Sequence, residues 1–440
     1  MLQSISIENF KSFRQATLPL APLTLLIGAN ASGKSNAIEA MQLLSWLATG
    51  RRLGDILVAM REQELNVRGT LVDFLFQHRG GRIVLGCSLT TVDYPHPLDF
   101  RITLQLSEDD EFRVLEEVLE NPAPDSRFPL YRVEEPARSY GNEIQVAYNN
   151  FARGGKKPRI TCIDQQAVFT QLTTPARFAA DHQRSQELIP AATSGLQQNL
   201  ESILFLDPVP RRMRGYSYKR ERSVQGDGAA LSSILYQLKV RGQKERILDF
   251  IRSLPEQDIR DLDFIHTPRN EVMVQLQENF GIRAEWRDAA VLSDGTLRVL
   301  AVAAALLSVP PGSTVVIEEI DNGVHPSRAA LLLDNIKRAA EERNLKVLLT
   351  THNPALLDAI PVESIPDTVA CYRDPEEGDS RLVRLADLGN YPELVAQGPL
   401  GQLVTKGILD RALKAPDRED AEERVEKGLD WLREFERSAR

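Results

Sequence analysis

The clearest chemical pattern in this chain lies between an apolar run and a helix-like run near its start. Residues 28–35 read G-A-N-A-S-G-K-S and match G-x-x-x-x-G-K-[ST], a loop whose backbone N–H groups and lysine bind phosphates. Residues 24–27 predict a short strand before this loop, and residues 36–47 predict a helix after it. Such a helix points its positive end at the phosphates. The pattern therefore predicts nucleotide binding.

Two adjacent carboxylates, Glu318 and Glu319, end the apolar run 314–317. Ending a buried strand in paired charge is costly unless a cation lies there. In a phosphate-loop enzyme the strand beside the loop brings one carboxylate to Mg²⁺ and a second to the attacking water. We therefore expect Glu318 at the metal and Glu319 as the base. The alternative is a strand that runs into an acidic turn.

A second apolar run leads to His352 within "LLTTHNPALLD", residues 348–358. Pro354 suits the first turn of a following helix. A histidine at this sheet edge can reach a γ-phosphate. In the alternative interpretation Thr351 or Asn353 caps the helix and His352 has no role.

The segment "VLSDGTLR", residues 291–298, precedes another apolar helix pattern. Ser293, Gly295 and the first amides of that helix form a second anion site, unless Ser293 or Asp294 is an ordinary N-cap. Two such helix starts cannot easily serve one phosphate group in one monomer. A second copy of the chain could supply one of the two helix starts to the same phosphate group.

These residues need an α/β fold to position them. Short strands surround the first helix, whereas the C-terminal part alternates helices with unbroken apolar strands, the pattern of a parallel sheet covered on both faces. We expect one mixed parallel and antiparallel sheet with an inserted helical and hairpin lobe. The predicted division is 1–120 for the N-terminal lobe with the loop, 121–288 for the insertion, 289–400 for the C-terminal lobe and 401–440 for a charged helical tail.

Composition limits the kinds of partner. The 440 residues carry a net charge of −9, which argues against nucleic-acid binding by bulk charge. A local basic cluster could contact DNA phosphates or a partner protein, although a solvated loop is the default for such a run. It comprises Arg211, Arg212, Arg214, Lys219, Arg220 and Arg222.

Cys87, Cys162 and Cys371 are widely spaced and predict neither a disulfide framework nor a zinc site. No stretch of the chain reads as a membrane span or a signal peptide. These features predict a cytoplasmic protein.

In order, "ISIENFKSF", the loop, "LSDGT", "VVIEEIDNGVHP" and "TTHNPALLDA" resemble ABC-type ATPase heads of the SMC, RecF and OLD group. The chain looks closest to prokaryotic RecF-like "AAA family" ATPases, many of which act in anti-phage or toxin systems beside a nuclease. The resemblance implies ATP and Mg²⁺ as cofactors. It implies that Ser293 and Gly295 touch the opposing subunit's γ-phosphate and that His352 is the switch histidine. The implied cofactor-binding residues of the loop are Gly28, Asn30, Ser32, Gly33, Lys34, Ser35 and Asn36, with Lys34 also catalytic and Ser35 also a metal ligand.

The sequence departs from the family pattern in places. "LSDGT" replaces L-S-G-G-Q, Glu318 stands where Asp is commoner, and His325 stands where SMC-type heads have an aspartate. The glutamine that completes Mg²⁺ binding in the family is not identifiable from spacing. The candidates are Gln77, Gln165 and Gln166.

Three functions stay open. The first is an ATPase that dimerises on nucleotide and regulates or assembles with a partner effector, a nuclease, in anti-phage defence. The second is a RecF- or SMC-like DNA-repair ATPase. The third is a weakly hydrolysing scaffold that senses nucleotide and holds a toxin inactive. No nuclease motif follows His352, so cleavage would belong to the partner.

Overall fold

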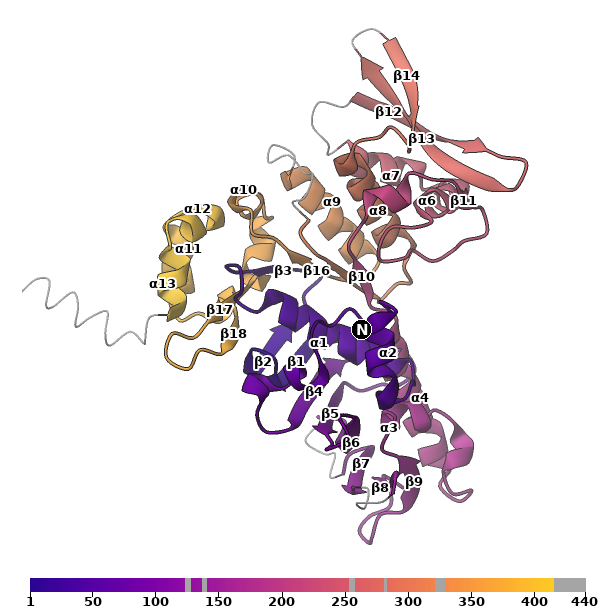
Figure 1. Cartoon of the computed structure of the whole chain (residues 1–440), viewed down its shortest axis with the longest axis vertical. Coiled ribbons are helices and arrows are strands. Elements are labelled where there is room, and N and C mark those ends of the chain that lie inside the picture. Colours follow the sequence, from indigo (N-terminus) through magenta and orange to yellow (C-terminus); the bar gives the residue numbers. More distant parts are fainter. Residues whose placement is uncertain (123–127, 137–140, 253–257, 281–282, 321–328, 415–440) are drawn as a thin grey trace, which may run out of the picture.

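The structure is a computed structural model and describes residues 1–122, 128–136, 141–252, 258–280, 283–320 and 329–414. Figure 1 shows an N-terminal lobe, a central parallel sheet with helices, and a small β-rich lobe at the opposite end. The predicted loop, His352 and both glutamates lie in the described part. His325 and the charged stretch 415–440 lie outside it.

An eight-stranded antiparallel sheet builds the N-terminal lobe, in the order β2-β1-β4-β5-β6-β7-β8-β9. Its strands are β1 (Leu2–Phe10), β2 (Phe13–Pro19), β4 (Arg82–Leu89), β5 (Leu98–Leu106), β6 (Phe112–Glu120), β7 (Tyr131–Glu135), β8 (Glu143–Tyr148) and β9 (Arg159–Ile163). The boundary predicted at residue 120 falls inside this sheet, because β7 pairs with β6.

A six-stranded sheet carries the residues of the predicted site, in the order β10-β15-β16-β3-β17-β18. Its strands are β3 (Leu23–Ile27), β10 (Leu204–Leu206), β15 (Thr314–Ile317), β16 (Lys346–Thr350), β17 (Val369–Arg373) and β18 (Ser380–Arg384). All neighbours are parallel except β17 and β18. The N-terminal strand β3 lies between β16 and β17, which confirms that the C-terminal part completes the sheet begun before residue 120.

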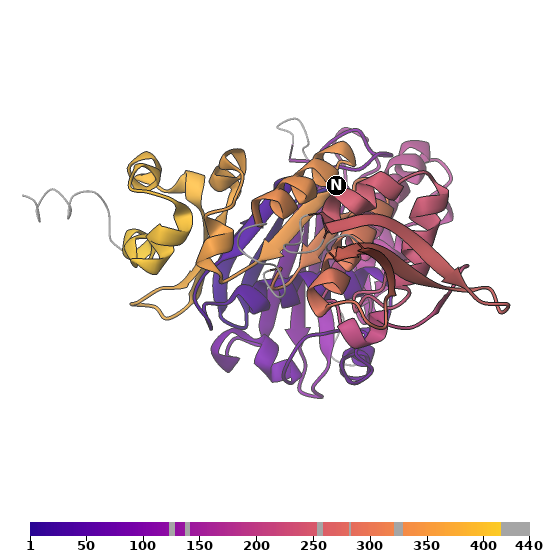
Figure 2. The ribbon, with the colours of Figure 1, turned by 90° about the horizontal axis from the view of Figure 1, so that it is seen from above.

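Both faces of this sheet are buried, as the unbroken apolar strands predict. Leu26, Val316 and Leu348 belong to a core shared with the antiparallel sheet, α1 (Lys34–Ala48) and α4 (Gln183–Glu201). Their chain neighbours pack on the other face against α6 (Leu231–Val240), α7 (Lys244–Ile251), α8 (Asp294–Ser308) and α9 (Ala329–Glu342). Figure 2 shows the molecule from above, with residues 391–414 (yellow) at one side of the central sheet and the strands of residues 258–288 (red) at the other.

A third, four-stranded sheet contains β11 (Ser217–Tyr218), β12 (Asp258–His266), β13 (Glu271–Phe280) and β14 (Arg283–Asp288). The predicted insertion 121–288 is therefore shared among all three sheets, since β7 to β9 join the first and β10 joins the second. The expected mixed α/β fold with parallel and antiparallel sheets is confirmed, and the strands of residues 121–288 are distributed among three sheets. Local patterns do not reveal which distant strand a short strand will pair with.

The remaining helices are short. They are α2 (Ile56–Arg61), α3 (Val168–Gln171), α5 (Pro210–Met213), α10 (Pro354–Leu357), α11 (Tyr391–Ala396), α12 (Leu400–Thr405) and α13 (Ile408–Lys414). Among the helices described, none has the length and apolar character needed to cross a membrane. All three cysteines are buried and form no disulfide.

Candidate active site

The phosphate-binding pattern forms the predicted strand, loop and helix: β3 ends at Ile27 and α1 begins at Lys34. Gly28 has φ 152°, and a Cβ there would lie 2.2 Å from the carbonyl oxygen of Cys371. Gly33 has φ 122°, and its Cβ would lie 2.5 Å from Ser380 Oγ. Both positions need glycine because a side chain would be strained and would collide with β17 or β18.

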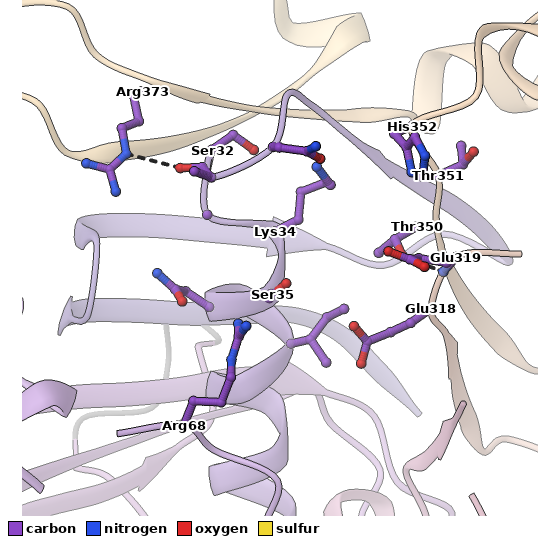
Figure 3. Close-up of a pocket in the computed structure, with 15 residues that line it drawn as sticks. Ser32, Lys34, Ser35, Arg68, Glu318, Glu319, Thr350, Thr351, His352 and Arg373 are labelled. Carbon is purple, nitrogen blue, oxygen red and sulfur yellow. Dashed lines mark hydrogen bonds between the residues drawn. The ribbon is translucent and has the colours of Figure 1, made fainter. Parts of the chain in front are cut away.

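The loop opens into a cavity of about 460 Å³ between α1 and the ends of β15 and β16. Figure 3 shows Lys34 and Ser35 on one side and Glu318, Glu319 and His352 on the other. The lining residues are Asn30, Ala31, Ser32, Gly33, Lys34, Ser35, Asn36, Ile38, Arg68, Glu318, Glu319, Thr350, Thr351, His352 and Arg373. Of the predicted loop residues, only Gly28 is absent from this lining.

Lys34 folds back over the loop that carries it. Its Nζ donates hydrogen bonds to the carbonyl oxygens of Gly28, at 2.6 Å, and of Ala29, at 3.0 Å. Burial lowers the pKa of this ammonium, while the negative potential of Cys371 and Glu319 acts in the opposite direction. The Lys34 ammonium therefore lies beside the loop, where it could contact a bound phosphate chain.

Glu318 and Glu319 follow the last residue of β15, as predicted. Burial raises the pKa of Glu318 above its usual value, and the negative charge of Asp207 raises it further. Glu319 adopts the left-handed region, at φ 48°, and its N–H donates to Thr350 Oγ1 at 2.9 Å. A non-glycine residue at positive φ is a strained arrangement that often occurs at functional positions.

His352 follows β16 and lines the same cavity. Asn353 caps α10, because its side-chain oxygen accepts a hydrogen bond from the Ala355 N–H at 3.0 Å. Asn353 therefore caps the helix, as the alternative interpretation predicted. His352 nevertheless lines the cavity.

The oxygen donors at this cavity suit Mg²⁺. Ser35 and Glu318 both line it, and Mg²⁺ is commonly bound by one or two protein groups together with substrate phosphates. Ser32 Oγ is buried and has no hydrogen-bond partner among the residues that the structure describes. A phosphate oxygen in the cavity would satisfy it. The residues present therefore fit a magnesium nucleotide.

Arg68 was not predicted, yet it lines the cavity beside Glu318. Its Nε donates to Glu39 Oε1 at 2.6 Å, and Glu39 also pairs with Lys11 of the opening "ENFKSF" motif. Arg373 was missed too; it donates to the Ala31 carbonyl at 3.1 Å. The sequence around each arginine carries no local signal, although the position of Arg373 at the end of a strand beside β3 could have revealed it.

None of the three candidate glutamines lines the cavity. Gln166 Nε2 donates to the Gly50 carbonyl at 2.5 Å, and the Gln165 carbonyl accepts from the Leu53 N–H at 2.8 Å. Gln77 lies in a short 3₁₀ turn. Asn36 does line the cavity, but its side chain donates to Ser12 Oγ at 2.7 Å.

Ser293 and Gly295 lie at the start of α8 and are not part of the cavity lining. Ser293 is the N-cap, and its Oγ accepts from the Thr296 N–H at 3.1 Å. The loop cavity and the second predicted anion site are therefore separate in one copy of the chain.

Two arginines of the basic cluster are engaged within the protein. Arg212 pairs with Asp227 at 2.7 Å, and Arg214 pairs with Asp294 at 2.6 Å. Arg214 also donates to backbone carbonyls ahead of α8. Both guanidinium groups thus have carboxylate partners within the chain. Arg211, Arg220 and Arg222 are exposed.

Two family models match the chain. Residues 176–358 match a family described as "AAA domain, putative AbiEii toxin, Type IV TA system", and residues 1–70 match "AAA ATPase domain". With the loop and the paired carboxylates at one cavity, these matches define the chain as a P-loop ATPase.

Relatives refine this class. An "ATP/GTP phosphatase" of Helicobacter pylori is 23% identical over 367 residues, which cover 82% of this chain and 87% of that protein. "DNA replication and repair protein RecF" of Gloeobacter violaceus is 45% identical over 69 residues, 16% of each chain. Together the family matches and these relatives support an SMC/RecF-like ATPase head.

Solved structures with a related arrangement include an SMC head bound to the C-terminal winged-helix domain of ScpA. It is 15% identical, covers 87% of this chain and 96% of its own, and has a TM-score of 0.42. The SMC head domain from Thermotoga maritima is 12% identical, covers 87% and 98%, and has a TM-score of 0.37.

Proposed function

We propose that this ATPase closes as a homodimer around two magnesium nucleotides and passes that state to a partner effector, a nuclease, in anti-phage defence. The observation that carries the proposal is the split between two groups of residues. The loop, Glu318, Glu319 and His352 line one cavity, whereas Ser293 and Gly295 lie outside it. A second copy could bring its helix start to this cavity.

In the proposed mechanism Lys34 binds the β- and γ-phosphates, with Gly28, Asn30, Ser32, Gly33 and Asn36 forming the cradle around them. Ser35 and Glu318 would hold Mg²⁺, which would supply charge neutralisation at the phosphates. Glu319 accepts the proton of the attacking water. His352 donates to the γ-phosphate. Arg68, held by Glu39, lines the same cavity.

The effector part of the proposal draws on the match to a family described as a putative AbiEii toxin of a type IV TA system. An ATPase of this kind would control the partner by its dimeric state, and the partner would carry the damaging activity.

The test of dimerisation uses Glu319→Gln, which should bind ATP and hydrolyse it slowly. Light scattering with ATP and Mg²⁺ should give twice the monomer mass, and with ADP the monomer mass. A monomer under both conditions, with ATP bound, would remove the dimeric mechanism. Co-purification with the product of the neighbouring gene then tests for the effector.

A RecF-like repair ATPase is the second candidate, favoured by the 45% identity to RecF over 69 residues. Tight binding of double-stranded DNA or DNA junctions by the purified protein alone would support it. An ATPase rate near zero in the wild-type protein would instead favour the toxin-holding scaffold.

A further inference from the structure

Arg214 makes an unusual set of contacts for a residue of a basic surface cluster. Its guanidinium donates to the carbonyl oxygens of Ala290, at 2.8 Å, and Leu292, at 2.7 Å, and approaches that of Ala289 at 3.4 Å. It also bonds Asp294 Oδ1 at 2.6 Å. These four groups belong to one segment, the stretch that leads into α8.

A guanidinium can hold such a set because its five N–H donors form a rigid, planar fork. Arg214 is only 30% exposed, so its bonds are partly shielded from water. Asp294 stands within "LSDGT" where the common form L-S-G-G-Q has glycine. The pairing with Arg214 gives this aspartate a physical role, which is to hold the segment in one conformation.

Arg214 ends a stretch of chain, residues 206–214, whose other end reaches the candidate ATP cavity. The Glu318 N–H donates to the Leu206 carbonyl at 3.4 Å. A second hollow, of about 700 Å³, is lined by Asp207 and Val209 and shares Ser35 and Glu318 with the cavity.

This connecting stretch, residues 206–214, is held stiffly. Pro208 and Pro210 restrict its backbone. The Asp207 and Val209 N–H groups donate to the Gly226 and Asp227 carbonyls at 2.8 and 2.9 Å. Met213 is 1% exposed, and α5 packs against α8. The stretch therefore links the carboxylate end of the cavity with the start of α8.

We propose that residues 206–214 act as a strut between the two sites and that Arg214 is its positioning residue, which presents Ser293 and Gly295 to the nucleotide of the second copy. The inference rests on the proposed dimeric function. It assigns Arg214 to communication between the two sites of the dimer and removes it from DNA binding.

The test compares Arg214→Ala and Arg214→Lys with Arg269→Ala, an exposed arginine in the turn between β12 and β13. Lysine keeps the charge, but one ammonium cannot reproduce the fork. Both Arg214 variants should keep nucleotide affinity within about twofold of wild type. Their ATPase rate and dimerisation with ATP should fall roughly tenfold to a hundredfold, the usual range for losing charge-assisted hydrogen bonds. Arg269→Ala should behave as wild type.

A double variant sharpens the test. If Asp294 acts through Arg214, adding Asp294→Ala to Arg214→Ala should cause little further loss. Loss of nucleotide binding or a lowered melting temperature in Arg214→Lys would overturn the inference, because the arginine would then only support the fold.

Ser293→Arg in the same assays distinguishes a failure of the proposed strut from a failure of the proposed dimer. Full activity of Arg214→Ala beside an inactive Ser293→Arg would overturn the strut and leave the dimer standing. Full activity of Ser293→Arg would overturn the dimer itself.

Discussion

Two helix starts in this molecule look alike in sequence and differ in structure. Helix α1 begins after Gly33, which has no side chain to cap it and adopts φ 122°. Helix α8 begins after Ser293, whose Oγ accepts from the Thr296 N–H. The first start opens into a cavity with Lys34, whereas the second is capped and held by Arg214.

The contrast between the uncapped start of α1 and the capped start of α8 indicates how each helix start could bind an anion. Helix N-termini attract anions because their first N–H groups lack partners within the helix. The start of α1 is preorganised for an anion from outside, since its glycines admit no side chain. The start of α8 is complete as a capped helix, so we expect it to act only when another copy presents a nucleotide to it.

The largest effect is expected at the first helix start. Lys34→Ala removes the main positive charge of the loop from the β- and γ-phosphates. We expect the ATPase rate to fall by about a thousandfold and the fold to survive, as measured by phosphate release and circular dichroism. Normal nucleotide affinity and turnover in the folded variant would remove the loop from the site.

Next in size is the change at Glu319. Glu319→Gln can still hydrogen-bond the water but cannot accept its proton, so single-turnover hydrolysis should slow by about a hundredfold while ATP remains bound. Glu318→Gln should instead increase the Mg²⁺ concentration needed for hydrolysis. Wild-type turnover in Glu319→Gln, with an inactive Glu318→Gln, would show that the two roles are exchanged.

A smaller effect concerns pH. The raised pKa of Glu318 means that this carboxyl becomes protonated at a higher pH than an ordinary glutamate, and Mg²⁺ needs the ionised form. The Mg²⁺ concentration required for half-maximal turnover should therefore rise as pH falls, beginning above the usual glutamate range. Mg²⁺ titrations of the ATPase rate between pH 5 and pH 8, roughly the window of interest, would measure it.

Asp207→Asn sharpens this measurement, because it removes a negative charge that helps to raise the pKa of Glu318. The rise in Mg²⁺ requirement should move to lower pH. The change should stay below about threefold and shrink at high salt, since Asp207 is exposed and screened. A shift to higher pH would contradict the assignment of Glu318 as the metal-side carboxylate.

Local sequence patterns were sufficient for the strand, loop and helix at residues 23–48 and for the strands that precede Glu318 and His352. Parallel strands bring their carboxyl ends to one edge, so the meeting of these residues with Lys34 could be foreseen. Arg68 could not, because its place depends on Glu39 and Lys11, which are distant in the sequence.

The region 121–163 shows the same limit in the fold. The predicted hairpins are present as the antiparallel strands β7, β8 and β9, but the sequence did not predict that these strands extend the N-terminal antiparallel sheet. Pairing with other strands determines which sheet these strands join, and the sequence of a short segment carries little information about that pairing. The contacts of Arg214 could not be predicted for a similar reason, since its partners lie at residues 289–294.

The central claim is that each nucleotide site uses Lys34 of one copy and Ser293 of another. Mixing Lys34→Ala with Ser293→Arg tests it most directly, with each variant alone as the control. In a mixed dimer one site carries both changes and the other carries neither, so two inactive proteins should regain ATPase activity when combined. Recovery toward a quarter of the wild-type rate, about what random pairing allows, is the predicted result. Full activity of Ser293→Arg alone, or no recovery in dimers shown to exchange subunits, would contradict the account.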